Sequence, residues 1–186
     1  MPDPLPFDPI ERAARLWSER IGEPSAMAAV TNVMRVQQIL QQAADGALRP
    51  LGLTFARFEA LVLLQFARDQ TLPMSKMGQR LQLHPTSITN IVDRLEGSGL
   101  VRRVPHPTDK RTTLVEITDA GRAACRDATT AVTSVDFGLV GLSDDDVATL
   151  TGLLTRVRHA AGDFVRPDSG PAGAAAHDVA SYDGGR

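Results

Sequence analysis

Two nearby groups of side chains in this sequence are suited to binding rather than to catalysis. The first group combines hydroxyl, amide and guanidinium side chains within the segment 85–96: Thr86, Ser87, Thr89, Asn90 and Arg94. The second group is a run of charged side chains: Asp109, Lys110 and Arg111. Hydroxyl and amide groups can read the edges of bases, and an Asn side chain can bind adenine through two hydrogen bonds. Because Lys and Arg neutralise phosphates, the two groups together indicate recognition of double-stranded DNA.

A predicted helix carries the first group. Pro85 suits the first helical position, where its missing N–H costs nothing, and Gly97 ends the helix. Apolar side chains recur on one face at a helical period: Ile88, Ile91, Val92 and Leu95. The polar group therefore lies on the opposite face. The pair Thr86 and Ser87 would also suit helix capping, which does not exclude a contact with DNA.

A predicted β-hairpin carries the second group. The β-prone runs Leu100–Val104 and Thr113–Thr118 flank a Pro-rich, basic tip. A shorter predicted helix, about Ser75–Leu81, precedes the polar-faced helix after a tight connection. Two helices followed by a hairpin indicate a winged helix-turn-helix within a mainly α (α+β) fold. The tip residue Arg111 would insert into a narrow minor groove, where the negative potential is enhanced.

The charge distribution agrees with one DNA-facing surface. The chain has a formal net charge of −2. Between Ser75 and Arg111, seven basic and three acidic side chains give +4, so the remainder carries −6. A local basic patch on an acidic protein suits placement of one face against a polyanion. A solvated basic loop would carry the same charges, and Arg94 could pair with Asp93 or Glu96 instead of a phosphate.

Five segments are expected along the chain. Residues 1–24 form an extension with a short helix, capped by Asp8 with Glu11 closing a capping box, and anchored by Trp17. Residues 25–52 hold a dimerisation helix that Ser25 caps, and 53–118 form the winged helix-turn-helix, with Thr54 capping a buried helix. Residues 119–165 contain two further dimerisation helices, and 166–186 form a disordered tail.

The two helices in 119–165 are expected to differ in character. The first begins at Thr118 and Asp119, carries a seam rich in small residues that continues to Leu139, and ends at Gly141. The second begins at Ser143, which forms a capping box with Asp146. Its apolar positions repeat at spacings of three and four, a pattern that predicts packing against a partner helix: Val147, Leu150, Leu154 and Val157. Since the central domain does not bury all the apolar faces of the flanking helices, we expect a homodimer that covers them.

The segment from about Thr54 to Gly121 resembles the MarR family of bacterial transcription regulators. The resemblance rests on TNIVDRLEGSGLVRR at 89–103 and DKRTTLVEITDAG at 109–121. It implies a homodimer held by N- and C-terminal helices that binds a pseudo-palindromic operator, with repression relieved by a small ligand. It also implies that Asp109 orients Arg111 through an ion pair and that Lys110 adds affinity for phosphate.

The resemblance further implies a ligand pocket between the dimerisation helices and the winged helix. The extra helix with Trp17 is similar to the urate-responsive branch, in which Glu59 would stand for the required acid. Asn90 occupies the place of one required Arg, although Arg102 or Arg103 could supply the other, and this departure argues against urate. A small aromatic or phenolic effector is expected instead, in contact with four side chains: Trp17, Phe55, Phe58 and Glu59.

Other classes of function have less support. The sequence has no Ser/His/Asp order, no Gly-rich phosphate loop and no paired His at helical spacing, so we expect neither an enzyme nor a bound cofactor. The His residues are scattered, and the acidic run Asp144–Asp146 suits helix capping, so no metal site is expected. Cys125, the one cysteine, lies on the small-residue face of a predicted helix and is expected to pack rather than to sense oxidants. No signal peptide or membrane span is apparent, which predicts a cytoplasmic protein.

The alternative is a winged helix that binds only protein. Such a module would have no need for an acidic and two basic residues together at the tip of its hairpin.

Overall fold

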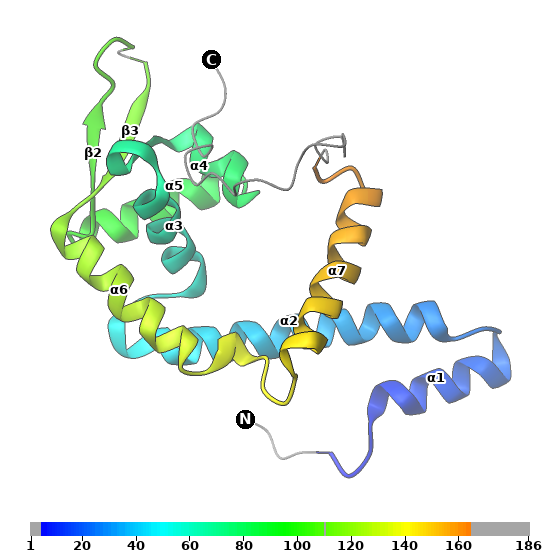
Figure 1. The fold of residues 1–186 in the computed structure, drawn as a ribbon. Helices are drawn as coiled ribbons and strands as arrows, with labels where there is room; N and C mark the ends of the chain where they lie inside the picture. The colour runs from blue at the N-terminus through cyan, green and yellow to red at the C-terminus, as the bar shows by residue number, and fades with distance from the viewer. Residues whose placement is uncertain (1–4, 110, 165–186) are drawn as a thin grey trace, which may run out of the picture.

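The computed structural model describes residues 5–109 and 111–164. Lys110 and the tail predicted to be disordered, 166–186, lie outside the described residues. The described helices run as follows: α1 Pro9–Arg20, α2 Ser25–Leu48, α3 Phe55–Phe66, α4 Met74–Leu81, α5 Pro85–Gly97, α6 Asp119–Thr133 and α7 Asp144–Ala160, with 3₁₀ turns η1 Arg49–Leu51, η2 Arg68–Gln70 and η3 Asp136–Gly138. Figure 1 shows α3, α4, α5 and the sheet gathered into one domain, from which α2 extends toward α1.

A small antiparallel sheet completes the domain. It contains β1 Thr71–Pro73, β2 Val101–Pro105 and β3 Thr113–Ile117, in the order β1-β3-β2. The predicted hairpin is confirmed as β2 and β3, with Arg102 opposite Glu116. Strand β1 was not expected from the sequence, because three residues that end in Pro73 are too short for a period-two pattern. The winged helix-turn-helix fold is therefore present.

The core lies between α3, α4, α5, α6 and the sheet, and it includes the last residue of α2. It is built from fully buried aliphatic side chains, among them Leu48, Leu61, Leu64, Met77, Ile88, Val92, Leu95, Val115, Ile117 and Val132. In α5, Ile88, Val92 and Leu95 are buried as the helical period predicts. Cys125 of α6 is also buried, and desolvation raises the pKa of its thiol. The expectation that Cys125 packs within the fold is confirmed.

The helix starts agree only partly with the predicted caps. The Asp8 side chain caps α1, but Glu11 binds Arg15 instead of closing a capping box. Ser25 is the first residue of α2 rather than its cap.

At α3, the residue at the cap position, Thr54, does not supply the capping bond. The N–H of Phe55 donates instead to Asp45 Oδ1 at 2.7 Å. The capping box of Ser143 with Asp146 at the start of α7 is confirmed.

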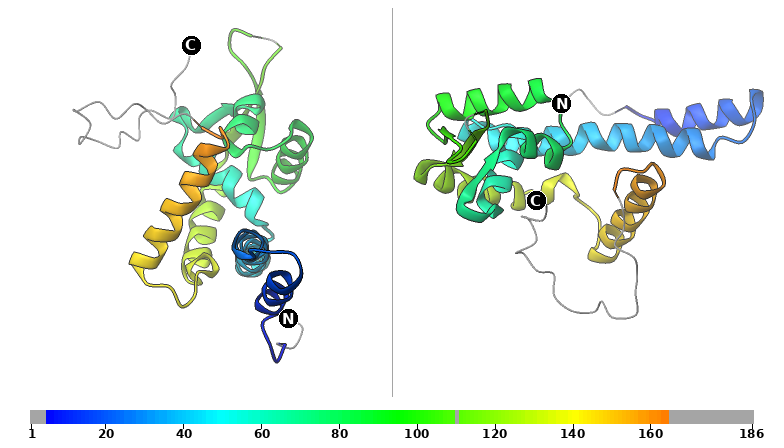
Figure 2. Two further views of the ribbon diagram at one scale, coloured as in Figure 1. Left: turned by 90° about the vertical axis from the view of Figure 1, so that its right-hand side faces the viewer. Right: turned by 90° about the horizontal axis from the view of Figure 1, so that it is seen from above.

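The long helix expected to reach Leu139 ends instead at Thr133. Asp136, Phe137 and Gly138 all have positive φ, which no α-helix can contain. The turn is set by packing, because a Cβ on Gly138 would lie 2.9 Å from Ala43 Cβ and 3.2 Å from Leu40 on α2. Glycine is required where η3 meets α2, and α7 leaves in a new direction (Figure 2).

The helices outside the winged domain leave large apolar side chains exposed. Val30 and Met34 of α2 are 57% and 62% exposed, and Val157 of α7 is 68% exposed. Helix α1 packs on the N-terminal part of α2, at a distance from the winged domain (Figures 1 and 2). Among the described residues, no helix combines the length and the apolar character that crossing a membrane requires.

Candidate nucleic-acid interface

Helix α5 presents its polar face to solvent. All five side chains proposed for the major groove are exposed: Thr86, Ser87, Thr89, Asn90 and Arg94. The cap of this helix is His84, whose Nδ1 accepts from the N–H of Thr86 at 3.3 Å. The structure therefore assigns capping to His84 rather than to the hydroxyls of Thr86 and Ser87. Only the hydroxyl of Thr89 has a described bond within this group, donated to the carbonyl of Pro85 at 3.1 Å.

Arg103 of β2 connects the hairpin to α5. Its guanidinium pairs with Asp93, at 2.5 Å, and with Glu96. The backbone N–H of Arg103 also donates to Glu96 Oε1 at 2.9 Å, and this bond is the main reason why the pKa of Glu96 is lowered. Sequence reasoning missed this role, although strand alternation separates Arg103 from its neighbour Arg102 onto the opposite face.

The ion pairs of Arg103 bear on whether Arg94 pairs with a neighbouring carboxylate or is free to contact a phosphate. Both carboxylates that could have paired with Arg94 are bound by Arg103 instead. Within the described part of the chain, Arg94 has no ion-pair partner and is exposed, so its charge is available to a phosphate.

Hydrogen bonds to two side chains order the tip of the wing. His106 Nδ1 accepts from the N–H groups of Thr108 and Asp109, at 3.3 and 3.1 Å. Asp109 Oδ2 accepts from the hydroxyl of Thr112 at 2.7 Å, and Oδ1 accepts from the N–H of Arg111 at 2.9 Å. Both bonds favour the ionised carboxylate and lower the pKa of Asp109.

The expected ion pair between Asp109 and the guanidinium of Arg111 is not found among the described residues. Asp109 holds the backbone of the turn, because its two oxygens are used by an N–H and a hydroxyl. The side chain of Arg111 is exposed. The turn therefore positions Arg111 through its main chain and leaves the guanidinium for another partner.

Arg102 and Arg103, either of which could have supplied an Arg for a urate-type ligand, are both paired with carboxylates. Arg102 lies opposite Glu116 in the β2–β3 pair and binds it through two nitrogens, at 2.8 and 3.0 Å. This pairing raises the pKa of Arg102 and lowers that of Glu116.

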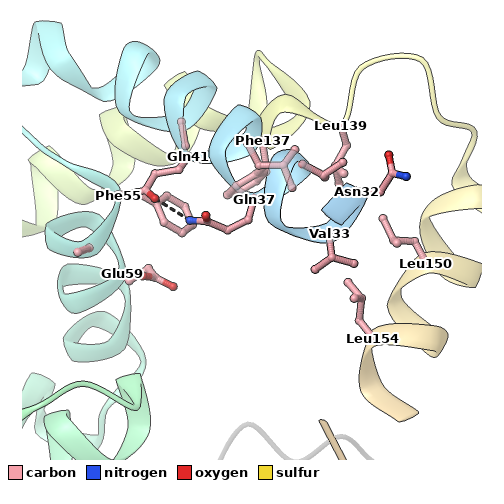
Figure 3. Close-up of a pocket in the computed structure, with 14 residues that line it drawn as sticks. Asn32, Val33, Gln37, Gln41, Phe55, Glu59, Phe137, Leu139, Leu150 and Leu154 are labelled. Atoms are coloured by element: carbon pink, nitrogen blue, oxygen red, sulfur yellow. Dashed lines mark hydrogen bonds between the residues drawn. The ribbon is translucent and has the colours of Figure 1, made fainter. Parts of the chain in front are cut away.

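Two apolar cavities lie between the winged domain and the flanking helices. One, of about 610 Å³, is lined by α2, α3, η3 and α7, and includes Phe55 and Glu59 (Figure 3). The other, of about 840 Å³, lies between α3 and α6 and includes Phe58. Partial burial raises the pKa of Glu59, which lines both cavities.

The proposed ligand group is not brought together in one subunit. Phe55 and Glu59 line both cavities and Phe58 only the larger one, whereas Trp17 lines neither. The reason is that α1 packs on the end of α2 that lies away from the winged domain (Figure 1). Phe137, which the sequence analysis did not single out, lines both cavities and packs edge-to-face on Phe55 with ring centroids 6.4 Å apart.

The sequence was compared with known proteins. Residues 53–113 match the family model described as the MarR family. The HTH-type transcriptional regulator MhqR of Bacillus subtilis (strain 168) is 35% identical over 107 residues, which are 57% of this chain and 72% of that protein. The chain belongs to the MarR family.

Solved structures of MarR-family regulators share the fold. Sco5413, a MarR family transcriptional regulator from Streptomyces coelicolor, is 48% identical with a TM-score of 0.71, and the match covers 76% of this chain and 99% of that one. A mutant MarR from E. coli complexed with operator DNA is 30% identical with a TM-score of 0.65, over 76% and 97% of the two chains. The chain is thus a member of a family of transcriptional regulators.

Proposed function

We propose that this MarR-family chain is a transcriptional repressor that binds a pseudo-palindromic operator as a homodimer. The observation that carries the proposal is the arrangement of charges around α5. Arg103 binds Asp93 and Glu96 on that helix, while Arg94 and Arg111 are exposed and have no ion-pair partner among the described residues. A helix whose acids are neutralised and whose hydroxyl and amide groups face solvent is suited to a major groove.

The wing adds the second half of the interface. Arg111 would enter the minor groove beside the groove that α5 occupies, held by the turn that His106 and Asp109 order. Lys110 is proposed to add affinity for phosphate. The solved complex of a mutant MarR with operator DNA, 30% identical to this chain, supports DNA binding by this fold.

The homodimer is supported by the apolar faces that a single chain leaves exposed. On α7, Leu154 and Val157 are exposed, and Val147 and Leu150 are half-buried along the same seam. Burial of such a face gains roughly 25 cal/mol per Å². A two-fold axis through these helices would present two α5 helices to half-sites about 34–36 Å apart along the duplex.

The direct test is binding to DNA selected from a random library by the wild-type protein. Fluorescence anisotropy would compare the wild type with Arg111→Ala and with Arg15→Ala, whose side chain pairs with Glu11 on α1, away from the wing. Weaker binding is expected for Arg111→Ala alone, with a smaller salt dependence. Equal affinity of all three proteins would contradict the role of the wing. Failure of the wild type to select any DNA would favour the alternative, a winged helix that binds only protein.

A small aromatic or phenolic effector is proposed for the two cavities. Their linings are largely apolar, with Glu59 as the shared acid and the rings of Phe55 and Phe137 as a common wall. Salicylate-type acids are expected to release the bound DNA, with urate as the comparison. Because the raised pKa of Glu59 favours its neutral form as the pH falls, release by a carboxylate should improve at lower pH. In Glu59→Gln this pH dependence should be reduced, and an unchanged dependence would contradict the role of Glu59.

A further inference from the structure

A third cavity, of about 510 Å³, lies at the base of the wing and differs in character from the two apolar cavities. Part of its lining is a row of three residues at adjacent positions across the sheet: Pro73 of β1, Leu114 of β3 and Val104 of β2. The rest comes from η2, the other two residues of β1, helix α4, the end of β2 and the start of the wing tip. We call this cavity the wing-base pocket.

The wing-base pocket is electropositive. Arg68 of η2 and Lys76 and Arg80 of α4 line it, and the one carboxylate in its lining is Asp69. Lys76 is exposed and has no ion-pair partner in the ranges that the structure describes. Three permanent cations around one concave site attract an anion, and the field inside a concave site is stronger than on an open surface.

His106 adds a hydrogen-bond donor to the same pocket. Its Nδ1 accepts from two backbone N–H groups of the wing tip and therefore carries no hydrogen. In the neutral ring, Nε2 must then carry the hydrogen and can donate it. The same tautomer therefore orders the wing through Nδ1 and leaves Nε2–H of this pocket-lining ring as a hydrogen-bond donor.

The place of the pocket in the fold points to its occupant. The β1–β3 register sets Pro73 opposite Leu114, next to the start of the wing tip, so α4 begins at the wing end of the sheet. The pocket therefore lies between the helix-turn-helix and the wing. If α5 occupies a major groove and the wing the neighbouring minor groove, one sugar-phosphate strand separates the two and must pass between these parts of the protein.

We propose that the wing-base pocket binds a phosphate of this DNA strand, with Lys76 as its direct contact, an inference that rests on the proposed DNA-binding function. Arg68 and Arg80 contribute positive potential, and His106 contributes a donor. The contact would fix the register between wing and helix on the duplex without reading sequence, as phosphate contacts do.

The test is the salt dependence of operator affinity for Lys76→Gln, with Arg15→Gln as the control of equal charge change on α1. Removal of one phosphate contact flattens the slope of log K against log salt by about 0.9, so a dimer from which two are removed should flatten by about 1.8. Arg15→Gln should keep the wild-type slope. Far-UV circular dichroism of both variants would confirm that they are folded.

A second experiment tests whether the bound phosphate belongs to the DNA backbone. Single methylphosphonates would be placed in turn along the DNA between the two grooves. One position per half-site should weaken the wild type and leave Lys76→Gln unaffected, because the variant no longer makes that contact. If every position weakens both proteins equally, the pocket does not hold the backbone.

Inorganic phosphate at constant ionic strength distinguishes a free anion from DNA. Binding of inorganic phosphate that depends on Lys76, together with an unchanged salt slope for DNA, would overturn the proposal in favour of a small-anion site. An unchanged slope for Lys76→Gln, with normal operator binding by the wild type, would overturn the pocket alone. If the wild-type protein binds no DNA at all, the proposed function itself is overturned.

Discussion

The substitution Gly121→Ala should destabilise the protein more than most single changes. Gly121 is buried at the start of α6, where the helix meets the turn that leads into β2. A Cβ at this position would lie 2.0 Å from the carbonyl oxygen of Leu100 and 2.8 Å from Ile117. Since Cβ contacts under 3.0 Å are essentially never seen, the carbonyl or the helix must move by about 1 Å.

That movement is opposed by the hydrogen bonds of Thr118. Its N–H donates to the carbonyl of Leu100 at 3.0 Å, its hydroxyl donates to the carbonyl of Gly99 at 2.8 Å, and the same hydroxyl accepts from the N–H of Gly121 at 3.0 Å. Overpacking costs about 1–3 kcal/mol, and each of two broken hydrogen bonds costs about 1 kcal/mol more. We therefore expect a loss of roughly 3–5 kcal/mol, or about 6–20 °C in Tm.

Urea unfolding followed by far-UV circular dichroism would measure the loss, at one fixed protein concentration because a dimer's stability depends on concentration. The matched control is Gly46→Ala in α2, where the added Cβ meets nothing within 4 Å. That substitution should stabilise the protein by about 0.5–1 kcal/mol, because Gly is a poor helix former. A midpoint for Gly121→Ala equal to that of the wild type would refute the reasoning, since it would mean that this joint relaxes at no cost.

Three further predictions concern DNA binding, acid stability and the reactivity of the buried thiol. Arg103→Gln should weaken operator binding by roughly fivefold, about 1 kcal/mol, without changing the slope of log K against log salt. Arg94→Gln should flatten that slope. A flattened slope for Arg103→Gln would mean that Arg103 contacts phosphate. The lowered pKa of Glu96 means that its ionised form stabilises the fold above the ordinary value of 4.5 and that this contribution is lost as the pH falls through the lowered pKa. Glu96→Gln should therefore show a smaller drop in Tm on acidification than the wild type, and an equal drop would exclude a stabilising pair. The buried Cys125 thiol, with its raised pKa, should react slowly with a disulfide reagent at neutral pH and rapidly in urea; fast reaction in the folded protein would contradict its packing.

The winged domain could be predicted because its signals are local. The apolar period of α5, with Ile88 and Val92 inward, and the β-prone runs around the basic tip each specify an element without help from distant residues. The capping box at Ser143 is local in the same way. These elements determine where the polar face of α5 and the wing lie in the chain.

What the sequence could not predict depends on contacts between distant segments. The end of α6 is set by the packing of Gly138 on Leu40 and Ala43, although the seam of small residues continues past that point. Strand β1 exists because β3 offers an edge to pair with.

The same limit applies to the site. That Arg103 binds carboxylates of α5 follows from the contact between β2 and α5, which no spacing in the sequence records. Trp17 was expected beside Phe55 because the sequence does not show which way the chain turns at Gly22, between α1 and α2. In the structure α1 packs on the end of α2 that lies away from the winged domain (Figure 1).

The position of the Phe137 ring matters for any molecule that enters either apolar cavity. It is held by a left-handed turn on one side and by the edge of Phe55 on the other, and it borders both apolar cavities. Because this ring forms part of both linings, a molecule that displaced it from one cavity would also change the shape of the other. Since Phe137 lies in the turn between α6 and α7, the same displacement would reach the start of α7.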